Sequence, residues 1–214
     1  MKLQIENEDI ELLSEKAFFW PRVSLLGLSD VHLGKAESFQ SLGIPLPSAA
    51  HVEDLKNIEK LVKKTNPKKV IILGDWIHHR SGWTPELQEE LKGFFARQTA
   101  VEWTLLIGNH ERGSLQQLAQ FPMKLQEESL EVGPFLLTHG HLETKSQKFQ
   151  IQGHFHPVIT LREGPLKMRL PCFVLQKKSL LLPSFGSLTG GHEFKTTAKD
   201  RVFAVTPSDV FEVQ

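Results

Sequence analysis

The feature that most constrains the fold of this chain is a set of three apolar runs that each end in a short polar motif. Short, nearly continuous apolar runs are typical of strands that are buried on both faces of a sheet. The polar residues that close such runs then lie at the carboxyl ends of strands, where open α/β sheets place their sites. The runs and their closing motifs are residues 23–28 with Ser29-Asp30, residues 70–73 with Gly74-Asp75, and residues 103–107 with Gly108-Asn109-His110.

Helical patterns separate these runs. Apolar residues recur at the spacing of one helix face between Val52 and Val62, and Pro67 closes that segment. Thr84 is a typical N-cap, and Pro85 then occupies the first helical position. The chain before residue 22 favours short antiparallel strands, and the chain after residue 123 favours further strands. We therefore expect an α/β sandwich with sheets in the middle and helices outside. The later strands are expected at residues 135–138, 149–152, 158–161, 172–175 and 180–182.

Composition excludes several classes of protein. The chain has 214 residues, of which 40% are hydrophobic and 23% charged, which argues against collagen, a disulfide-stapled miniprotein and a wholly disordered chain. Lys+Arg and Asp+Glu are both 25, so any nucleic-acid binding must come from a local patch. The single cysteine, Cys172, allows no internal disulfide and is expected in the core. The acidic N-terminal segment and the short apolar runs predict a cytoplasmic protein without membrane contact.

Five polar motifs, each after an expected strand, predict a metal site. Their oxygen and imidazole groups, without thiolates, suit Mn²⁺, Fe or Zn²⁺ rather than an iron–sulfur cluster. In Asp-x-His and His-x-His, alternate side chains lie on the same side of an extended segment, so both can reach one ion. A single motif of this kind more often forms a turn or an ordinary polar contact than a metal site, but five of them in this order strongly indicate a metal site. The motifs are Asp30-Val31-His32, Gly74-Asp75, Gly108-Asn109-His110-Glu111, Thr138-His139-Gly140-His141 and Gly153-His154-Phe155-His156.

The order of these motifs resembles the calcineurin-like metallophosphoesterase superfamily, whose motifs read Asp-x-His, Gly-Asp, Gly-Asn-His, His and Gly-His-x-His. The resemblance covers nearly the whole chain. It implies a four-layer α-β-β-α sandwich that forms a single domain over residues 1–214. It also implies a phosphoester hydrolase with two divalent metal ions, with Mn²⁺ as the first expectation and Fe or Zn²⁺ as alternatives.

The same resemblance assigns roles to individual residues. His110 matches the superfamily's acid histidine, and His78 matches a histidine that its double-strand-break nucleases carry after Gly-Asp. Glu111 stands where aspartate is usual, and we expect it to affect the orientation of His110. The first ion would be held by Asp30, His32, Asp75 and His156, and the second by Asp75, Asn109, His139 and His154, so that Asp75 bridges the two.

A finer resemblance lies outside the metal motifs. Residues 29–39, 43–47, 171–173 and 182–191 look like the bacterial ligase-associated phosphoesterase family. That family is associated with a DNA ligase and a helicase and is regarded as a DNA repair nuclease. The fourth motif departs from it, because His139-Gly140-His141 stands where many members read His-Glu-Pro. The resemblance implies a functional association with a ligase and a helicase.

The expected substrate is DNA, held beside the metal motifs by three cationic side chains, Lys35, Arg80 and Arg112. Arginine can clamp a phosphate with two parallel hydrogen bonds. A neutral protein has little charge with which to grip a duplex, so we expect single strands or ends as substrate. The alternative is a phosphatase or a small-nucleotide phosphodiesterase of the same fold. A scaffold without enzyme activity is disfavoured, because every expected ligand position holds a ligating residue.

Overall fold

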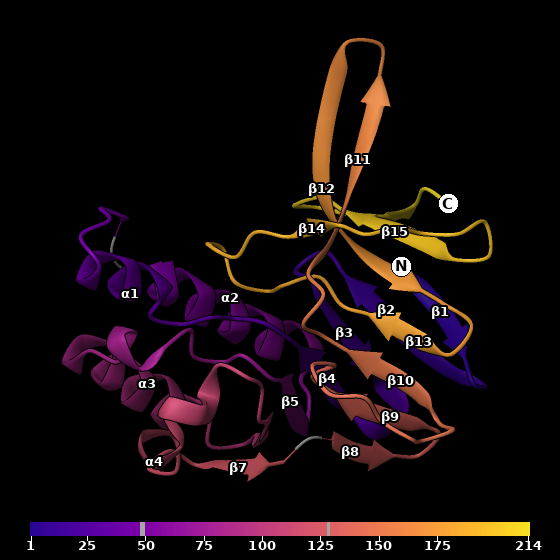
Figure 1. Cartoon of the computed structure of the whole chain (residues 1–214). Coiled ribbons are helices and arrows are strands. Elements are labelled where there is room, and N and C mark those ends of the chain that lie inside the picture. Colours follow the sequence, from indigo (N-terminus) through magenta and orange to yellow (C-terminus); the bar gives the residue numbers. More distant parts are fainter. Residues whose placement is uncertain (48–49, 128) are drawn as a thin grey trace.

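The computed structural model of the chain describes residues 1–47, 50–127 and 129–214. Two β-sheets pack face to face, and the helices lie together on one side, beside the first sheet (Figure 1). The first sheet begins with three antiparallel strands, and its later strands β4 to β7 are parallel. Its order is β1 (Lys2–Ile5), β2 (Glu8–Leu13), β3 (Ala17–Trp20), β4 (Leu25–Leu28), β5 (Lys69–Leu73), β6 (Glu102–Leu106) and β7 (Met123–Gln126).

The helices connect the parallel strands and cover the outer face of the first sheet. Thr84 caps α3 as expected, because its hydroxyl accepts a hydrogen bond of 3.3 Å from the Leu87 amide. Apolar faces of α2 and α3 bury Ile58 and Leu91 against Ile72 of the sheet. The helices are α1 (Lys35–Ser41), α2 (Ala50–Thr65), α3 (Pro85–Arg97) and α4 (Leu115–Leu118), with 3₁₀ turns at Pro21–Val23, Arg80–Gly82 and Glu111–Gly113.

The second sheet contains all the strands that the sequence predicted after residue 123. Its β9 and β10 are parallel neighbours, so their carboxyl ends share one edge. Phe135, Ile151 and Phe173 of this sheet pack against Leu25 and Ile71 of the first sheet, which forms the core between the sheets. The strands are β8 (Ser129–Val132), β9 (Phe135–Thr138), β10 (Phe149–Gln152), β11 (Pro157–Glu163), β12 (Leu166–Leu175), β13 (Ser179–Leu181), β14 (His192–Glu193), β15 (Arg201–Val205) and β16 (Val210–Glu212).

The expected α/β sandwich is confirmed, but its helical layer lies on one side. Within the described part of the chain, α1 to α4 all lie between Lys35 and Leu118. The outer face of the second sheet instead carries a small apolar cluster that includes Cys172 and is covered by Phe194 and Val213. The reason lies in the sequence after residue 123, where short strand-like runs leave no segment with helical spacing. Cys172 is buried, as expected.

None of the described helices combines the length and the apolar character that crossing a membrane requires.

Candidate metal centre

The seven predicted ligands come together at one edge of the sandwich. The parallel order of β4, β5 and β6 places the residues that follow them at a common edge. The loops after β9 and β10 reach the same place from the second sheet, because the His139 ring contacts the Asn109 side chain at 3.2 Å. Seven side chains from five loops, far apart in the sequence, therefore surround one small volume.

The candidate ligating atoms form three adjoining groups. Asp30, His32 and His156 offer atoms that all lie within 4.8 Å of one another, and so do Asp75, His139 and His154. A third such group consists of His32, His78 and His110. Oδ2 of Asp75 lies 3.7 Å from Nε2 of His32 and 3.3 Å from Nε2 of His139, so this carboxylate stands between the groups. The first two groups are parts of the two expected ligand sets, and Asp75 contacts one residue of each set. The bridging role of Asp75 stays a prediction.

The donor chemistry at this edge fits divalent cations. Oδ1 of Asp30 and Nε2 of His156 lie 2.9 Å apart, and both are buried without a hydrogen-bond partner among the described residues. A carboxylate oxygen and an imidazole nitrogen at this separation are both metal-ligand atoms, so the two can share one cation. Carboxylate and imidazole donors without thiolates suit Mn²⁺, Fe or Zn²⁺.

The electrostatics of the centre keep its carboxylates ionised. Burial opposes the charge of Asp75, but the hydrogen bond and the charge of His139 outweigh it and hold the pKa of Asp75 well below its usual range. Burial also opposes the charge of His139, yet the Asp75 and Asp30 carboxylates raise its pKa to about 9. Burial lowers the pKa of His32 to about 3, so its ring is neutral. The proton on His139 balances the charge of the two carboxylates, and a bound metal cation would balance the same charge in its place.

The backbone at the ligands is strained. Asp30, His32, Asp75, His154 and His156 have φ of 58°, 54°, 52°, 69° and 44°, all in the left-handed region. This region costs a residue other than glycine about 1–2 kcal/mol. Strain of this kind persists where the surrounding structure enforces it and gathers at functional sites. Five strained positions among seven expected ligands mark this edge as a site.

Two glycines let the loops approach this closely. Gly74 has φ of 80°, and a Cβ atom there would lie 2.4 Å from the His139 ring. A Cβ atom on Gly108 would lie 2.2 Å from Oδ1 of Asp75. Only glycine fits both positions, which gives the Gly-Asp and Gly-Asn-His motifs a steric reason.

Hydrogen bonds outside the ligand groups orient the rings. Nδ1 of His139 contacts the Leu73 carbonyl oxygen at 2.8 Å, which leaves Nε2 for the centre. Nδ1 of His78 lies 3.4 Å from Nδ1 of His32, on the side of that ring away from Asp75. Such contacts fix which nitrogen of a histidine faces a metal. His78 therefore acts on the geometry of His32.

Ser29 and the loop after β13 support the first ligand loop, a role that their residue types did not predict. The Ser29 hydroxyl lies within hydrogen-bond distance of Oδ2 of Asp30, at 2.5 Å, and of the Leu73 carbonyl oxygen, at 2.8 Å. The amides of Phe185 and Gly186 donate to the carbonyls of Ser29 and Asp30. Residues 182–191, noted above only as a resemblance, thus hold the first ligand loop in place. No pattern of residue types in the sequence predicts this contact between the two loops.

Glu111 joins two of the ligand loops, and its expected effect on the orientation of His110 stays a prediction. Its side chain is fully buried and accepts hydrogen bonds from three backbone amides, those of Asp75 at 3.0 Å, Ile77 at 3.0 Å and Gly108 at 2.7 Å. Burial first, and the neighbouring charge of Asp75 second, raise the pKa of Glu111 to about 7 despite these bonds. None of its bonds reaches the His110 ring. Glu111 is a positioning residue that fastens the loop after β5 to the loop after β6.

We expect Glu111→Ala to lower the free energy of unfolding by about 2–4 kcal/mol, because three buried N–H groups would lose their acceptor. Denaturant unfolding of the metal-loaded and the chelated protein measures this. Glu89→Ala is the matched control, since Glu89 is exposed and, among the described residues, forms an ion pair with Lys92 alone. If Glu111→Ala matches wild type in both states, the positioning role is wrong.

His110 lies beside the centre with one nitrogen available. Its Nδ1 contacts the His78 carbonyl oxygen, an acceptor, so Nδ1 carries a proton. Its Nε2 lies 3.8 Å from Oδ2 of Asp75, and the side chain keeps 33% of its exposure. The His78 ring stacks on the His110 ring at 5.2 Å. Nε2 of His110 is therefore the atom that can exchange a proton with a group bound at the metals.

Two hollows at this edge contain the expected arginines. A hollow of about 360 Å³ is lined by Arg80, Asn109 and His110, together with His79 and Gly113. A second hollow, of about 230 Å³, is lined by Arg112, Gly108 and His141 among others. Lys35 opens α1 and is half-buried, and its charge contributes to lowering the pKa of His78 to about 4, after the larger effect of burial. All three expected cations thus lie near the metal motifs.

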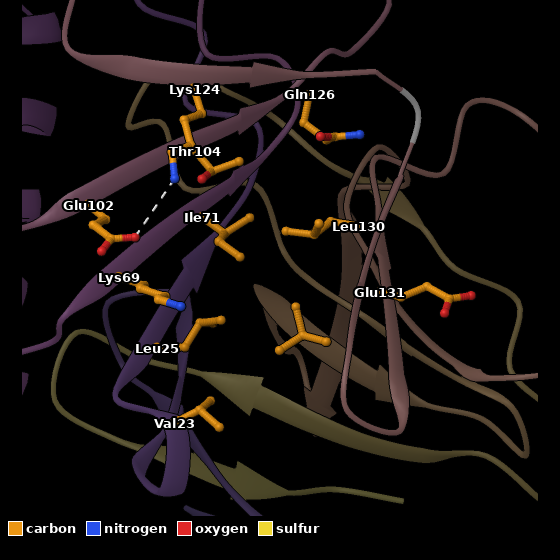
Figure 2. A pocket seen from close by; sticks show the side chains of 11 residues that line it. Val23, Leu25, Lys69, Ile71, Glu102, Thr104, Lys124, Gln126, Leu130 and Glu131 are labelled. Carbon is orange, nitrogen blue, oxygen red and sulfur yellow. Dashed lines mark ion pairs between the residues drawn. The ribbon is translucent and has the colours of Figure 1, made fainter.

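A larger cavity lies away from this site. Its volume is about 390 Å³, and it opens between the sheets near the amino ends of β5 and β6, opposite the ligands. Figure 2 shows aliphatic side chains, such as Leu25 and Ile71, directed into it and an ion pair of 4.0 Å between Glu102 and Lys124 at its border. It contains none of the predicted site residues.

The donor set and its place at the strand ends indicate a centre for two metal ions. Residues 23–193 match the calcineurin-like phosphoesterase family, and the chain therefore belongs to that family. The protein is a hydrolytic phosphoesterase, and the resemblance found in the sequence is confirmed.

Solved structures extend this comparison. Over 100% of this chain and 99% of the other, the structure is similar to the Pseudomonas putida nuclease MPE, with a TM-score of 0.85 and 29% identity. It is also similar to Yfce, a phosphoesterase from E. coli, with a TM-score of 0.46 and 18% identity over 88% of this chain and 97% of that one. A comparison with curated protein sequences found no match.

Proposed function

We propose that this protein is a phosphodiesterase that cleaves single-stranded DNA or DNA ends with two Mn²⁺ ions. The observation that carries the proposal is the pair of ligand groups joined by Asp75, in a chain that is similar along its whole length to a structure described as a nuclease. The oxygen and nitrogen donors support Mn²⁺ as the metal. A role in DNA repair, with a DNA ligase and a helicase as functional associates, extends the proposal.

Two divalent cations held here would supply Lewis acidity toward the phosphate oxygens and a water nucleophile near neutral pH. The chain's own residues supply the rest. His110, protonated on both nitrogens, donates the Nε2 proton to the leaving oxygen of the ester, a step typically worth about 10²–10⁴-fold. Arg80 and Arg112 bind the phosphates on either side of the cleaved bond, which a monoester lacks.

The test compares diesters with monoesters. Metal-loaded protein is assayed on bis-p-nitrophenyl phosphate, p-nitrophenyl phosphate, and labelled single- and double-stranded DNA, each with Mn²⁺ and with chelator. We expect diesters to be cleaved faster than the monoester, single strands faster than duplex, and no turnover with chelator. If the monoester turns over faster than every DNA, the protein is a phosphatase and the proposal is wrong.

A further inference from the structure

A two-stranded arm projects from the metal centre. It consists of residues 157–171, the outer part of the β11–β12 hairpin, and stands clear of the sandwich (Figure 1). Its first residue, Pro157, directly follows the expected ligand His156. The arm is anchored by β14, since the His192 amide donates to the His156 carbonyl at 2.9 Å. The position of the arm is therefore tied to the loop that carries His156.

The register of the hairpin gives the arm two unlike faces. Thr160 lies opposite Arg169, and Arg162 lies opposite Lys167. Alternate residues of a strand point to the same face, so these cations share one face of the arm, which we call the basic face. The other face is apolar, with Met168 at 58% exposure.

The strand β12 relates the basic face to the rest of the molecule. Phe173 lies in the core between the sheets, whereas Cys172 and Val174 lie on the outer side. Lys167 and Arg169 are an even number of residues from Phe173, so they continue its face. The basic face thus looks toward the side of the second sheet on which the first sheet packs. The metal centre lies at the edge of the sandwich, where His156 directly precedes the first strand of the arm.

Arg169 donates a hydrogen bond to the Gly191 carbonyl, but the charges of Arg162 and Lys167 are not explained by local pairing. Arg162 and Lys167 are exposed, and neither forms an ion pair with a described side chain. Like charges directly opposite one another on a ribbon are destabilising. The Glu193 carboxylate contacts Thr160 near the base of this face, so the unpaired positive charge lies on Arg162 and Lys167, farther out along the arm. A repulsive pair on a projecting arm points to an anionic partner.

We propose that the basic face binds phosphates of the single strand as it leaves the metal centre. This proposal rests on the proposed function. At about 3.3 Å per residue, Arg169, opposite Thr160, lies roughly 13 Å along the arm from His156, and Arg162 lies roughly 20 Å along it. These side chains contact backbone phosphates outside the bond that is cleaved. They add affinity for long strands without reading sequence.

The test measures how binding depends on salt. Each protein is metal-loaded and carries His110→Asn, so that a labelled long oligothymidylate is bound but cleaved slowly. We expect Arg162→Gln with Lys167→Gln to reduce the slope of log affinity against log salt by about 0.7 per lost contact, with roughly tenfold weaker binding at low salt. Lys177→Gln with Lys178→Gln, at the exposed turn between β12 and β13, is the matched charge control and leaves the slope unchanged.

Two further readouts separate the explanations. Hydrolysis of bis-p-nitrophenyl phosphate, which has a single phosphate, reports on the metal centre, and an equal loss there and on DNA overturns the proposal. If the unaltered enzyme cleaves single strands and the Arg162→Gln, Lys167→Gln variant has the same salt dependence of binding as the reference protein, the arm proposal is wrong but the proposed function stands. Leu166→Ser with Met168→Ser tests whether the arm joins two copies of the protein. If this variant dissociates a dimer while Arg162→Gln with Lys167→Gln leaves DNA binding unchanged, the arm is a protein interface and the arm proposal is wrong. If the enzyme cleaves no DNA, the proposed function itself fails.

Discussion

Asp75→Ala is expected to remove both metal ions and to reduce phosphodiester hydrolysis by roughly 10³-fold or more. The reason is the position of its carboxylate, which lies between Nε2 of His32 and Nε2 of His139 at 3.7 and 3.3 Å. Its other oxygen accepts a hydrogen bond of 3.1 Å from the His110 amide. One substitution therefore weakens both ligand groups and loosens the loop of the proton donor.

Elemental analysis and steady-state assays measure this effect. His156→Ala is the matched control, because His156 belongs to one group only and its loss should leave about one ion per chain. Circular dichroism in chelator checks that Asp75→Ala is folded. A variant that keeps two ions at saturating Mn²⁺ would contradict the bridging role, and so would wild-type protein that never binds more than one.

His110→Asn is expected to keep the metals but to lower kcat on DNA by roughly 10²–10⁴-fold. Nε2 of His110 faces the centre while Nδ1 is held by the His78 carbonyl, which places the ring to donate a proton. The ring also lies close enough to His32 and His78 to form a ligand group with them, so the metal content of this variant is measured as well. The loss should be much smaller on bis-p-nitrophenyl phosphate, because nitrophenolate leaves without a proton.

The comparison of the two substrates decides between roles. His192→Asn serves as the control, since His192 is exposed and its side chain lies in neither ligand group. Equal losses on DNA and on the nitrophenyl diester would mean that His110 holds the phosphate or the metals instead. Loss of an ion in the elemental analysis would have the same meaning.

The strands and helices of the first half could be predicted because the signals for them come from residues that are close together in the sequence. Residues 70–73 read as a buried strand, and Thr84 with Pro85 reads as a helix start, since both depend on neighbours within a turn or two. The expected sandwich is confirmed, and its described helices all lie between Lys35 and Leu118, because the chain after residue 123 has no segment with helical spacing. The short α1 was missed for the related reason that a helix of 7 residues carries little periodicity.

The sequence by itself determined the chemistry of this protein. It shows which carboxylates, amides and imidazoles follow the strands, and in what order. Only the tertiary structure decided what depends on contacts between distant segments. Glu111 binds amides up to 36 residues away, and the faces of the arm are set by the pairing of β11 with β12. The left-handed backbone of Asp30 and Asp75 likewise follows from loops that hold it there. Residue type limits what a position can bind, but the packing of the loops and the register of the strands determine what it touches.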